Sequence, residues 1–221
     1  MNRQLAIYWD LEHVRDPFDP ASVHELCFPS ADTRALLLQW TERQGHAKNL
    51  LLYGPSGSGK TRAAEVLCRE RLGQRSVEWH PIEYIPCESG TFDQALQHVK
   101  SGRQNFQKLT DSDFEQFYIL DEFDNFRAAQ QLQAKQVLEQ TDVTFVLITN
   151  HIANIDPGVR NRCLEISWHI PSADVCLPRL RQLADRTGAG HVSDSTLVER
   201  VYTTAGWRQM LRNIDLVRSI P

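Results

Sequence analysis

The sequence contains no apolar stretch long enough to cross a membrane as a helix. Such a helix needs about 20 consecutive apolar residues, whereas the apolar runs in this sequence have the length of strands. The N-terminal segment also lacks the basic and then apolar regions that mark a secretory signal. We therefore expect a cytoplasmic protein that has no membrane partner.

Cysteine is scarce, and no two cysteines form a C-x-x-C pair. The five thiols stand singly, at Cys27, Cys68, Cys87, Cys163 and Cys176. An odd number of isolated cysteines argues against a disulfide framework and against a zinc site. The eight histidines are dispersed too, and none has a second ligand-type residue at a spacing that would seat a metal on one helix face. We expect reduced, mostly buried thiols.

The sequence also lacks an excess of basic residues, internal repeats and low-complexity segments. Its formal net charge of −4 gives no long-range attraction to nucleic acid for the molecule as a whole, although local basic faces can exist. Hydrophobic residues make up 41% and charged residues 24% of the chain, close to the average of folded globular proteins. Composition therefore indicates a folded globular chain and argues against a disordered one.

Short apolar runs alternate with amphipathic stretches along the first three quarters of the chain. Strands are predicted over residues 49–53, 77–85, 117–120, 143–149 and 164–168, and helices over residues 31–43, 61–72, 92–100 and 128–139. Three of these strands are almost continuously apolar, as strands buried on both faces are. The pattern predicts an α/β fold with a parallel sheet of about five strands and helices on both faces.

From His169 onward the pattern changes, because no further strand is predicted. Amphipathic helices are predicted over residues 175–186, 195–205 and 208–219, with Gly188, Gly190 and Gly206 between them. We therefore expect two domains: an α/β domain over residues 1–169 and a small helical lid domain over residues 170–221.

A phosphate-binding loop is predicted directly after the first strand of the sheet. Its sequence satisfies G-x-x-x-x-G-K-[ST] and consists of Gly54, Pro55, Ser56, Gly57, Ser58, Gly59, Lys60 and Thr61. Glycines let the backbone amides turn inward toward phosphate oxygens, and the following helix adds its positive end. Lys60 is expected to reach the outer phosphates of ATP, and the Thr61 hydroxyl to bind Mg²⁺. The alternative is a chance glycine-rich turn.

Two acidic residues follow the apolar run 117–120. A buried strand that ends in carboxylates is costly unless the acids face a cation or solvent. We expect Asp121 to be the partner of Mg²⁺ and Glu122 to polarise the water that attacks ATP. Taken alone, an apolar run followed by acids is a common strand end, but together with the phosphate loop it indicates an ATP-hydrolysing site.

The two motifs resemble those of the AAA+ ATPases, and within them the small subunits of sliding-clamp loaders. Residues 53–61 are similar to the family's Walker A phosphate loop, and residues 120–124 to its Asp-Glu-Ala-Asp box (Walker B), with Phe123 in place of alanine. The resemblance implies a P-loop NTPase fold, ATP and Mg²⁺, an oligomer with other AAA+ subunits, and DNA and a sliding clamp as partners. Trp9 and residues 15–17 resemble the family's adenine-side element, with Asp16 inserted.

Four further residues receive roles from the resemblance. Asn150 matches sensor 1, which orients water or monitors the terminal phosphate; otherwise it caps a turn. Arg162, before Cys163, matches the arginine finger that enters a neighbouring subunit's site, and Arg160 is the competing candidate. Arg208 matches sensor 2, which touches the phosphates from the lid. The alternatives are an arginine in a surface salt bridge for Arg162 and an ordinary solvated arginine for Arg208.

The sequence departs from the clamp-loader pattern in two places. The family's helical collar domain has no counterpart, so we expect an oligomer held by the ATPase domains alone or by a collar from another subunit. The family's polar asparagine near the end of the second strand is missing at residues 85–87. Other AAA+ loaders or regulators, acting on a helicase, an origin or a transposase, fit the same motifs. A non-catalytic module that uses ATP as a switch is a third possibility.

Overall fold

The computed structural model describes residues 7–8, 18–44, 46–73, 82–88, 92–109, 115–139 and 143–218. Trp9 and residues 15–17 lie outside the described residues. In the described part of the chain, no helix combines the length and apolar character that a bilayer span requires.

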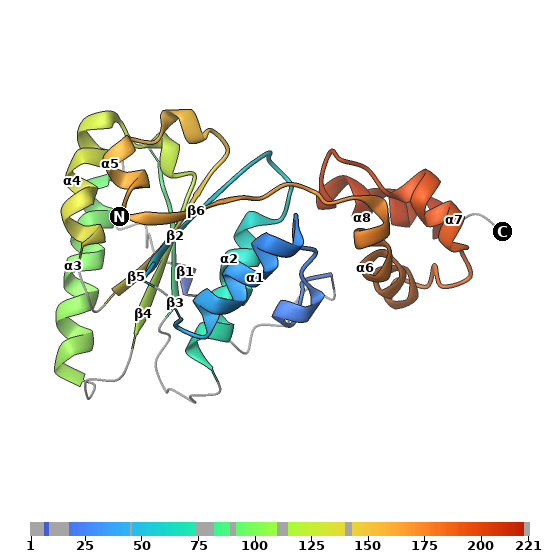
Figure 1. Ribbon diagram of the computed structural model, residues 1–221, viewed down its shortest axis with the longest axis horizontal. Helices are drawn as coiled ribbons and strands as arrows, with labels where there is room; N and C mark the ends of the chain where they lie inside the picture. Colours follow the sequence, from blue (N-terminus) through green and yellow to red (C-terminus); the bar gives the residue numbers. More distant parts are fainter. Residues whose placement is uncertain are drawn as a thin grey trace, which may run out of the picture.

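A single sheet forms the centre of the larger part of the molecule (Figure 1). Its strand order is β1-β3-β4-β5-β2-β6. The strands are β1 (Ile7–Tyr8), β2 (Asn49–Tyr53), β3 (Ile82–Pro86), β4 (Gln116–Asp121), β5 (Val143–Thr149) and β6 (Cys163–Ser167). The pairings among β2 to β6 are parallel, which confirms the predicted parallel sheet. The two-residue β1 pairs antiparallel with β3 at the edge and was not predicted.

Helices cover both faces of the sheet (Figure 1). One face carries α1 (Ala31–Thr41) and α2 (Lys60–Leu72); the other carries α3 (Phe92–Leu109), α4 (Ala128–Leu138) and α5 (Pro157–Arg160). Because successive strand residues point to opposite faces, Leu50 and Leu52 join a core with Trp40 of α1, whereas Leu51 joins a second core with Val137 of α4.

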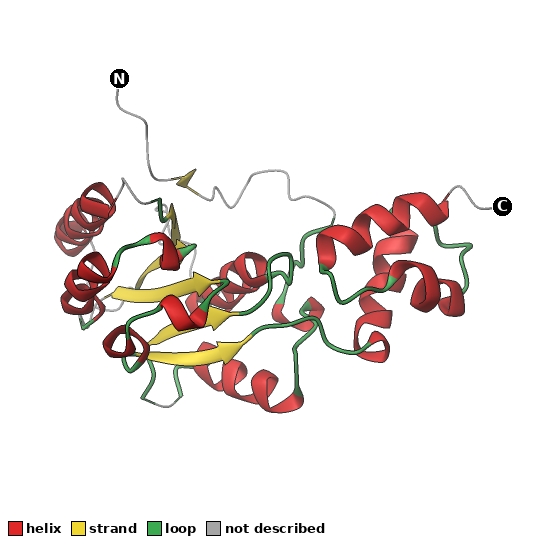
Figure 2. Cartoon of the chain, turned by 90° about the horizontal axis from the view of Figure 1, so that it is seen from above, coloured by secondary structure: helices red, strands yellow, loops and turns green. Residues whose placement is uncertain are grey.

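The C-terminal helices stand beyond the carboxyl ends of the strands, where the arrowheads point in Figure 2. They are α6 (Ala173–Arg186), α7 (Asp194–Thr196), the π-helical turn η4 (Leu197–Val201) and α8 (Trp207–Arg218). A third hydrophobic core joins them, built around residues such as Leu180, Met210 and Ile214. Partly buried Phe18 and Cys27 also pack on this core, so the division into domains at residue 169 stays a prediction.

Two predicted helices differ from the observed ones by more than two residues at one end. Helix α3 continues to Leu109 rather than ending near residue 100. The helix predicted over 195–205 ends at Val201, because Tyr202 adopts extended backbone angles. All five cysteines are free, as expected, and Cys68, Cys87 and Cys176 are buried.

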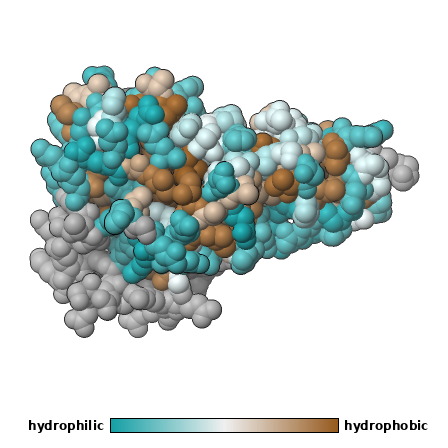
Figure 3. Space-filling view, viewed as in Figure 1, coloured by the Kyte–Doolittle hydropathy of each residue, from teal (hydrophilic) through white to brown (hydrophobic). Residues whose placement is uncertain are grey.

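Figure 3 shows one face of the molecule, which is mainly hydrophilic. Hydrophobic residues interrupt it in the middle of the face and along the C-terminal helices. The parallel topology places the carboxyl ends of β2, β4 and β5 side by side, since Tyr53 pairs with Thr149 and Leu120 with Leu147. Ligands of open parallel sheets bind at this edge.

Candidate nucleotide-binding site

The loop between β2 and α2 has a backbone that requires glycine at three positions. Gly54, Gly57 and Gly59 have φ angles of +152°, +79° and +92°, which side-chain-bearing residues rarely adopt. Gly59 immediately precedes the first residue of α2, Lys60. The loop therefore leads directly into a helix N-terminus, an arrangement that binds phosphate through backbone amides.

Trp168, the residue after β6, packs against this loop and forms hydrogen bonds with it and with β2. The indole Nε1 of Trp168 donates to the carbonyl oxygen of Ser58 at 3.1 Å, and its backbone N–H donates to Tyr53 at 2.7 Å. A Cβ atom on Gly54 would come within 2.1 Å of the Trp168 carbonyl oxygen. Gly54 is thus needed for close backbone packing as well as for the turn. The sequence motif alone gives no sign of Trp168.

Lys60 lies across the loop and reaches the end of β5. Its Nζ donates to the carbonyl oxygens of Gly54 and Pro55 and to Oδ1 of Asn150, each at 2.9 Å. The side chain is buried, and burial lowers the pKa of the Lys60 ammonium; nearby Asp121 opposes this shift and Arg208 adds to it. The structure therefore brings together Lys60 and Asn150, two residues that the sequence predicts to act on the same phosphate.

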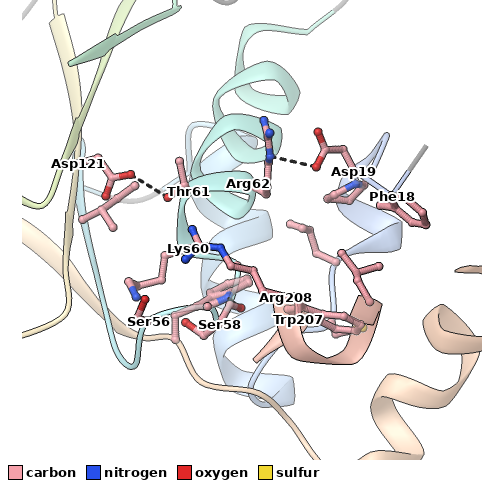
Figure 4. Close-up of a pocket in the computed structure, with 18 of the residues that line it drawn as sticks. Phe18, Asp19, Ser56, Ser58, Lys60, Thr61, Arg62, Asp121, Trp207 and Arg208 are labelled. Atoms are coloured by element: carbon pink, nitrogen blue, oxygen red, sulfur yellow. Dashed lines mark hydrogen bonds and ion pairs between the residues drawn. The ribbon is translucent and has the colours of Figure 1, made fainter. Parts of the chain in front are cut away.

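Asp121 receives hydrogen bonds from two neighbouring elements. Its Oδ2 accepts from the hydroxyl of Thr61 and from the phenol of Tyr84, both at 2.8 Å (Figure 4 shows the first). The pKa of Tyr84 is raised, chiefly by burial and then by the charge of Asp121, so the phenol stays protonated and donates. The sequence does not predict Tyr84 as a site residue, because its proximity to Asp121 depends on the pairing of β3 with β4.

These oxygen atoms fit Mg²⁺. Carboxylate and hydroxyl oxygens are its preferred protein ligands, and those of Thr61 and Asp121 lie 2.8 Å apart. Within the described residues, no cluster of three or more His, Cys, Asp or Glu side chains could hold a metal. An ion here would need oxygens from water or from a bound phosphate chain, as Mg²⁺ sites with one or two protein ligands do.

Glu122 has an unusual backbone conformation. Its φ and ψ angles of 55° and 44° place it in the left-handed region, which is uncommon for a residue other than glycine and concentrates at functional sites. The side chain lines the same cavity as Lys60. The amide of Asn125 donates to Glu122 Oε2 at 3.2 Å and to the carbonyl oxygen of Cys87 at 2.9 Å. A carboxylate therefore stands beside Asp121 on the cavity, and its role as a general base stays a prediction.

The C-terminal helices touch the phosphate loop directly. The backbone N–H of Trp207 donates to the carbonyl oxygen of Gly57 at 2.8 Å. The Trp207 ring lies so close to Gly59 that a Cβ there would be 3.2 Å from it. Arg208, the next residue, lines the cavity near Lys60 (Figure 4). The structure thus brings Arg208 to the same cavity as Lys60, and its contact with phosphates stays a prediction; Trp207 was not predicted as a site residue.

Lys60, Thr61, Asp121, Glu122 and Asn150 line one cavity of about 600 Å³. The lining also has an apolar part, which consists of Phe18, Pro20, Leu26, Cys27, Leu183 and Leu211. A cavity that combines cationic and amide groups with apolar side chains suits a nucleotide, which has a charged phosphate chain and a flat base. None of the apolar residues was predicted, because they come from segments far apart in the sequence.

Arg162 and Arg160 do not line this cavity. Arg162 forms an ion pair with Glu139 and donates to the carbonyl oxygen of Gly158 at 2.6 Å. Arg160 is paired with Glu165, with an Nη2–Oε2 distance of 2.8 Å. The predicted contact of Arg162 with a neighbouring subunit's phosphates stays a prediction.

A match to a protein-family model assigns the chain to a family. Residues 50–170, more than half of the chain, match the family described as "ATPase family associated with various cellular activities (AAA)". This chain belongs to the AAA family. The AAA match covers β2 through β6, and therefore the phosphate loop, Asp121, Glu122 and Asn150.

The AAA relatives include replication factor C subunits. The chain is 29% identical to replication factor C subunit 4 of Caenorhabditis elegans over 78% of this chain and 53% of that protein. It is 26% identical to the replication factor C large subunit of Methanosarcina acetivorans over 85% of this chain and 30% of that protein. Replication factor C small subunit 2 of Pyrobaculum arsenaticum is 29% identical over 72% of this chain and 49% of its own length. The chain thus spans about a third to a half of these relatives.

Among solved structures, the fold is similar to the Holliday junction branch migration motor RuvB of Thermotoga maritima. The TM-score is 0.66 at 16% identity, over 93% of this chain and 66% of that one. At this identity the likeness supports the fold, a P-loop NTPase sheet followed by helices, and nothing finer.

Proposed function

We propose that this chain binds and hydrolyses ATP as a subunit of a clamp-loader-type assembly, which loads or remodels a partner protein on DNA. One observation carries the proposal. The phosphate-side residues Lys60, Thr61 and Asp121 meet in one cavity, whereas Arg162 lies outside it on the same chain. In the proposed assembly, Arg162 instead completes the site of a neighbouring subunit. The names of the replication factor C relatives supply the clamp-loader class.

The proposed reaction is hydrolysis of the terminal phosphoanhydride bond of ATP. Glu122 takes a proton from a water molecule, whose oxygen attacks the γ-phosphorus. The bond from that phosphorus to the bridging oxygen breaks, and ADP leaves with the bond's electron pair. Lys60 stabilises charge on the outer phosphates, and Asn150 orients the water or the γ-phosphate. Mg²⁺ held at Thr61 and Asp121 would neutralise phosphate charge.

The assembly is proposed to close and open because each ATP site is shared between two subunits. Arg162 of one subunit would contact the triphosphate bound to its neighbour, and Arg208 would contact it from the helices of the same chain. Loss of the terminal phosphate removes those contacts, so ATP favours a closed assembly and ADP an open one. Binding of ATP and its hydrolysis would thereby alternately close the assembly around its partner and release it.

A direct test combines ATP turnover with assembly. We expect the ATPase rate to rise with primed DNA and a sliding clamp, and the assembly mass to rise with a non-hydrolysable ATP analogue. Stimulation by a helicase or a transposase instead of a clamp would favour another class of AAA+ loader. Absence of turnover under every condition, with Glu122→Gln behaving as the wild type, would favour a non-catalytic ATP switch.

Two sets of variants test the residue roles. Lys60→Ala should abolish nucleotide binding, and Lys100→Ala, which changes an exposed lysine on α3, should not. Mixing Arg162→Ala subunits with Glu122→Gln subunits should restore part of the hydrolysis. At some interfaces, the intact Glu122 of the first variant would meet the intact Arg162 of the second. A mixture as inactive as its components would mean that each site is completed within one chain.

A further inference from the structure

Residues 18–28, here called the N-terminal arm, are fastened to two separate parts of the molecule. At one end, Asp19 Oδ1 lies 3.0 Å from Nε of Arg62, which directly follows Thr61 on α2 (Figure 4). At the other end, Glu25 pairs with Arg179 of α6. The N-terminal arm therefore bridges the phosphate-loop helix and the C-terminal helices.

The Glu25–Arg179 pair joins a buried arginine to a partly buried carboxylate, and both groups make further hydrogen bonds. Arg179 is only 7% exposed, and its Nη1 donates to Glu25 Oε2 at 2.6 Å while its Nη2 donates to the carbonyl oxygen of Phe18 at 3.0 Å. Glu25 Oε2 also accepts from the backbone N–H of Ala21 at 3.1 Å, and Oε1 accepts from the amide of Gln182 at 3.3 Å. The pair thus ties two points of the N-terminal arm to one helix.

The charges in this pair depend on each other. Burial lowers the pKa of the Arg179 guanidinium, and Glu25 opposes that shift. Burial also acts to raise the pKa of Glu25, but the Ala21 amide, the charges of Arg179 and Arg186 and the Gln182 amide outweigh it and leave that pKa lowered. Removing Glu25 would leave the buried Arg179 guanidinium without its carboxylate partner.

The apolar part of the cavity lining comes from two sources. The N-terminal arm contributes Phe18 and Leu26, and the C-terminal helices contribute Leu183 and Leu211. Glu25 and Arg179 line the same cavity as these residues and as the phosphate loop. The Glu25–Arg179 pair therefore joins the two segments that supply the apolar lining.

We propose that Glu25 and Arg179 are positioning residues for the nucleoside part of the bound nucleotide. They hold the two apolar walls at the separation that a base requires, and they leave the phosphate contacts of Lys60 untouched. This inference rests on the proposed ATP-binding function and extends it to residues without a predicted role. Loss of the pair should weaken binding of a nucleotide without weakening binding of its phosphate chain alone.

The test compares Mg²⁺–ATP with Mg²⁺–tripolyphosphate, an inorganic chain that has no base, by calorimetric titration of the full chain. Arg179→Met, which keeps an unbranched side chain of similar length without the charge, should raise the Kd for ATP about tenfold or more. Its Kd for tripolyphosphate should stay within a factor of two of the wild-type value. If Arg179→Met does not fold, Glu25→Gln provides the same comparison.

A matched control is Arg181→Met on the same helix. Arg181 pairs with Asp194 at the surface and does not line the cavity, so both affinities should be unchanged. Equal weakening of ATP and tripolyphosphate in Arg179→Met would show that the pair only maintains the fold, and an unchanged affinity for ATP would show that it positions nothing. Either result would overturn the proposal. Failure of the wild-type chain to bind either ligand would instead refute the proposed function.

Discussion

The backbone N–H of Trp207 lies 2.8 Å from the carbonyl oxygen of Gly57, so a main-chain hydrogen bond joins the C-terminal helices to the phosphate loop. The contact leaves no room for a side chain at Gly206, where a Cβ atom would come within 2.7 Å of that same oxygen. Because Arg208 follows immediately, this junction fixes the position of its side chain relative to Lys60. The orientation of the helices should therefore control nucleotide affinity.

Replacing Gly206 with alanine tests this control. Gly206→Ala forces apart two backbones and strains a φ of +122°, so we expect ATP affinity to fall about tenfold and the unfolding free energy by about 1–3 kcal/mol. Gly188→Ala is the matched control, because Gly188 has a φ of +81° but a Cβ atom added to it would meet no other atom within 4 Å. It should lose stability without losing ATP affinity. An unchanged affinity in Gly206→Ala would contradict the role of the junction.

Tyr84 offers a second test, because its hydroxyl is one of two donors to Asp121 Oδ2. Tyr84→Phe removes this hydrogen bond and little else, so Asp121 should be less well oriented. We expect kcat to fall about three- to tenfold and half-maximal activity to require more Mg²⁺. Tyr202→Phe is the control, since that hydroxyl donates to Pro171 among the C-terminal residues. Identical Mg²⁺ titrations for Tyr84→Phe and wild type would refute the prediction.

His98 and Glu83 predict a pH dependence of stability. Hydrogen bonding to Glu83 raises the pKa of His98 and outweighs the opposing effect of burial. A raised histidine pKa adds stability that is fully present below the unfolded pKa of about 6.5 and is lost as pH rises through the higher folded value. We expect the unfolding free energy to decrease above pH 6.5 by about 1 kcal/mol or less, because solvent partly screens the pair.

Chemical denaturation at a series of pH values measures this effect. Glu83→Gln should flatten the part of the profile above pH 6.5, because the neutral amide no longer favours the protonated imidazole. Other titrating groups contribute equally to both proteins, so the difference between the two profiles isolates the pair. Parallel profiles would mean that His98 does not gain its proton from Glu83.

The elements that could be predicted from the sequence are those specified by contiguous residues. Residues 143–149 are apolar except for two threonines and form β5 with the predicted bounds, because a strand buried on both faces needs apolar residues throughout. Helix α3 was predicted too short, because it continues through Ser101 and Gly102 to Leu109. A glycine inside a helix costs only about 1 kcal/mol, which the rest of an 18-residue helix can outweigh.

In the candidate site, too, the residues of contiguous motifs could be predicted and those brought together by the fold could not. Residues 54–61 and Asp121 belong to compact motifs, and the structure brings them together. Tyr84 reaches Asp121 only because β3 pairs with β4, and Glu25 meets Arg179 across 154 positions of sequence. Contacts of this kind depend on strand order and on the docking of the C-terminal helices, which no local pattern encodes.

If Arg162 contacts ATP bound to a neighbouring subunit, as proposed, its ion pair with Glu139 should slow hydrolysis. Glu139 holds its guanidinium in an ion pair at the protein surface. To contact a neighbour's phosphates, Arg162 must leave Glu139, so the carboxylate competes with the phosphates for the same cation. Glu139→Gln weakens the competitor, and exposed ion pairs contribute about 0.2–1 kcal/mol. We therefore expect the ATPase rate of the assembled protein to rise by up to about fivefold.

The control uses the neighbouring pair, in which Glu165 holds Arg160. Glu165→Gln should leave the rate of the assembled protein unchanged, because Arg160 is not the residue that reaches the phosphates. The reverse outcome, acceleration by Glu165→Gln and none by Glu139→Gln, would assign the trans contact to Arg160. Arg160 ends α5 and Arg162 lies two residues beyond it, so a general loosening of this segment would accelerate hydrolysis in both variants. Acceleration in only one variant indicates specific competition for the arginine.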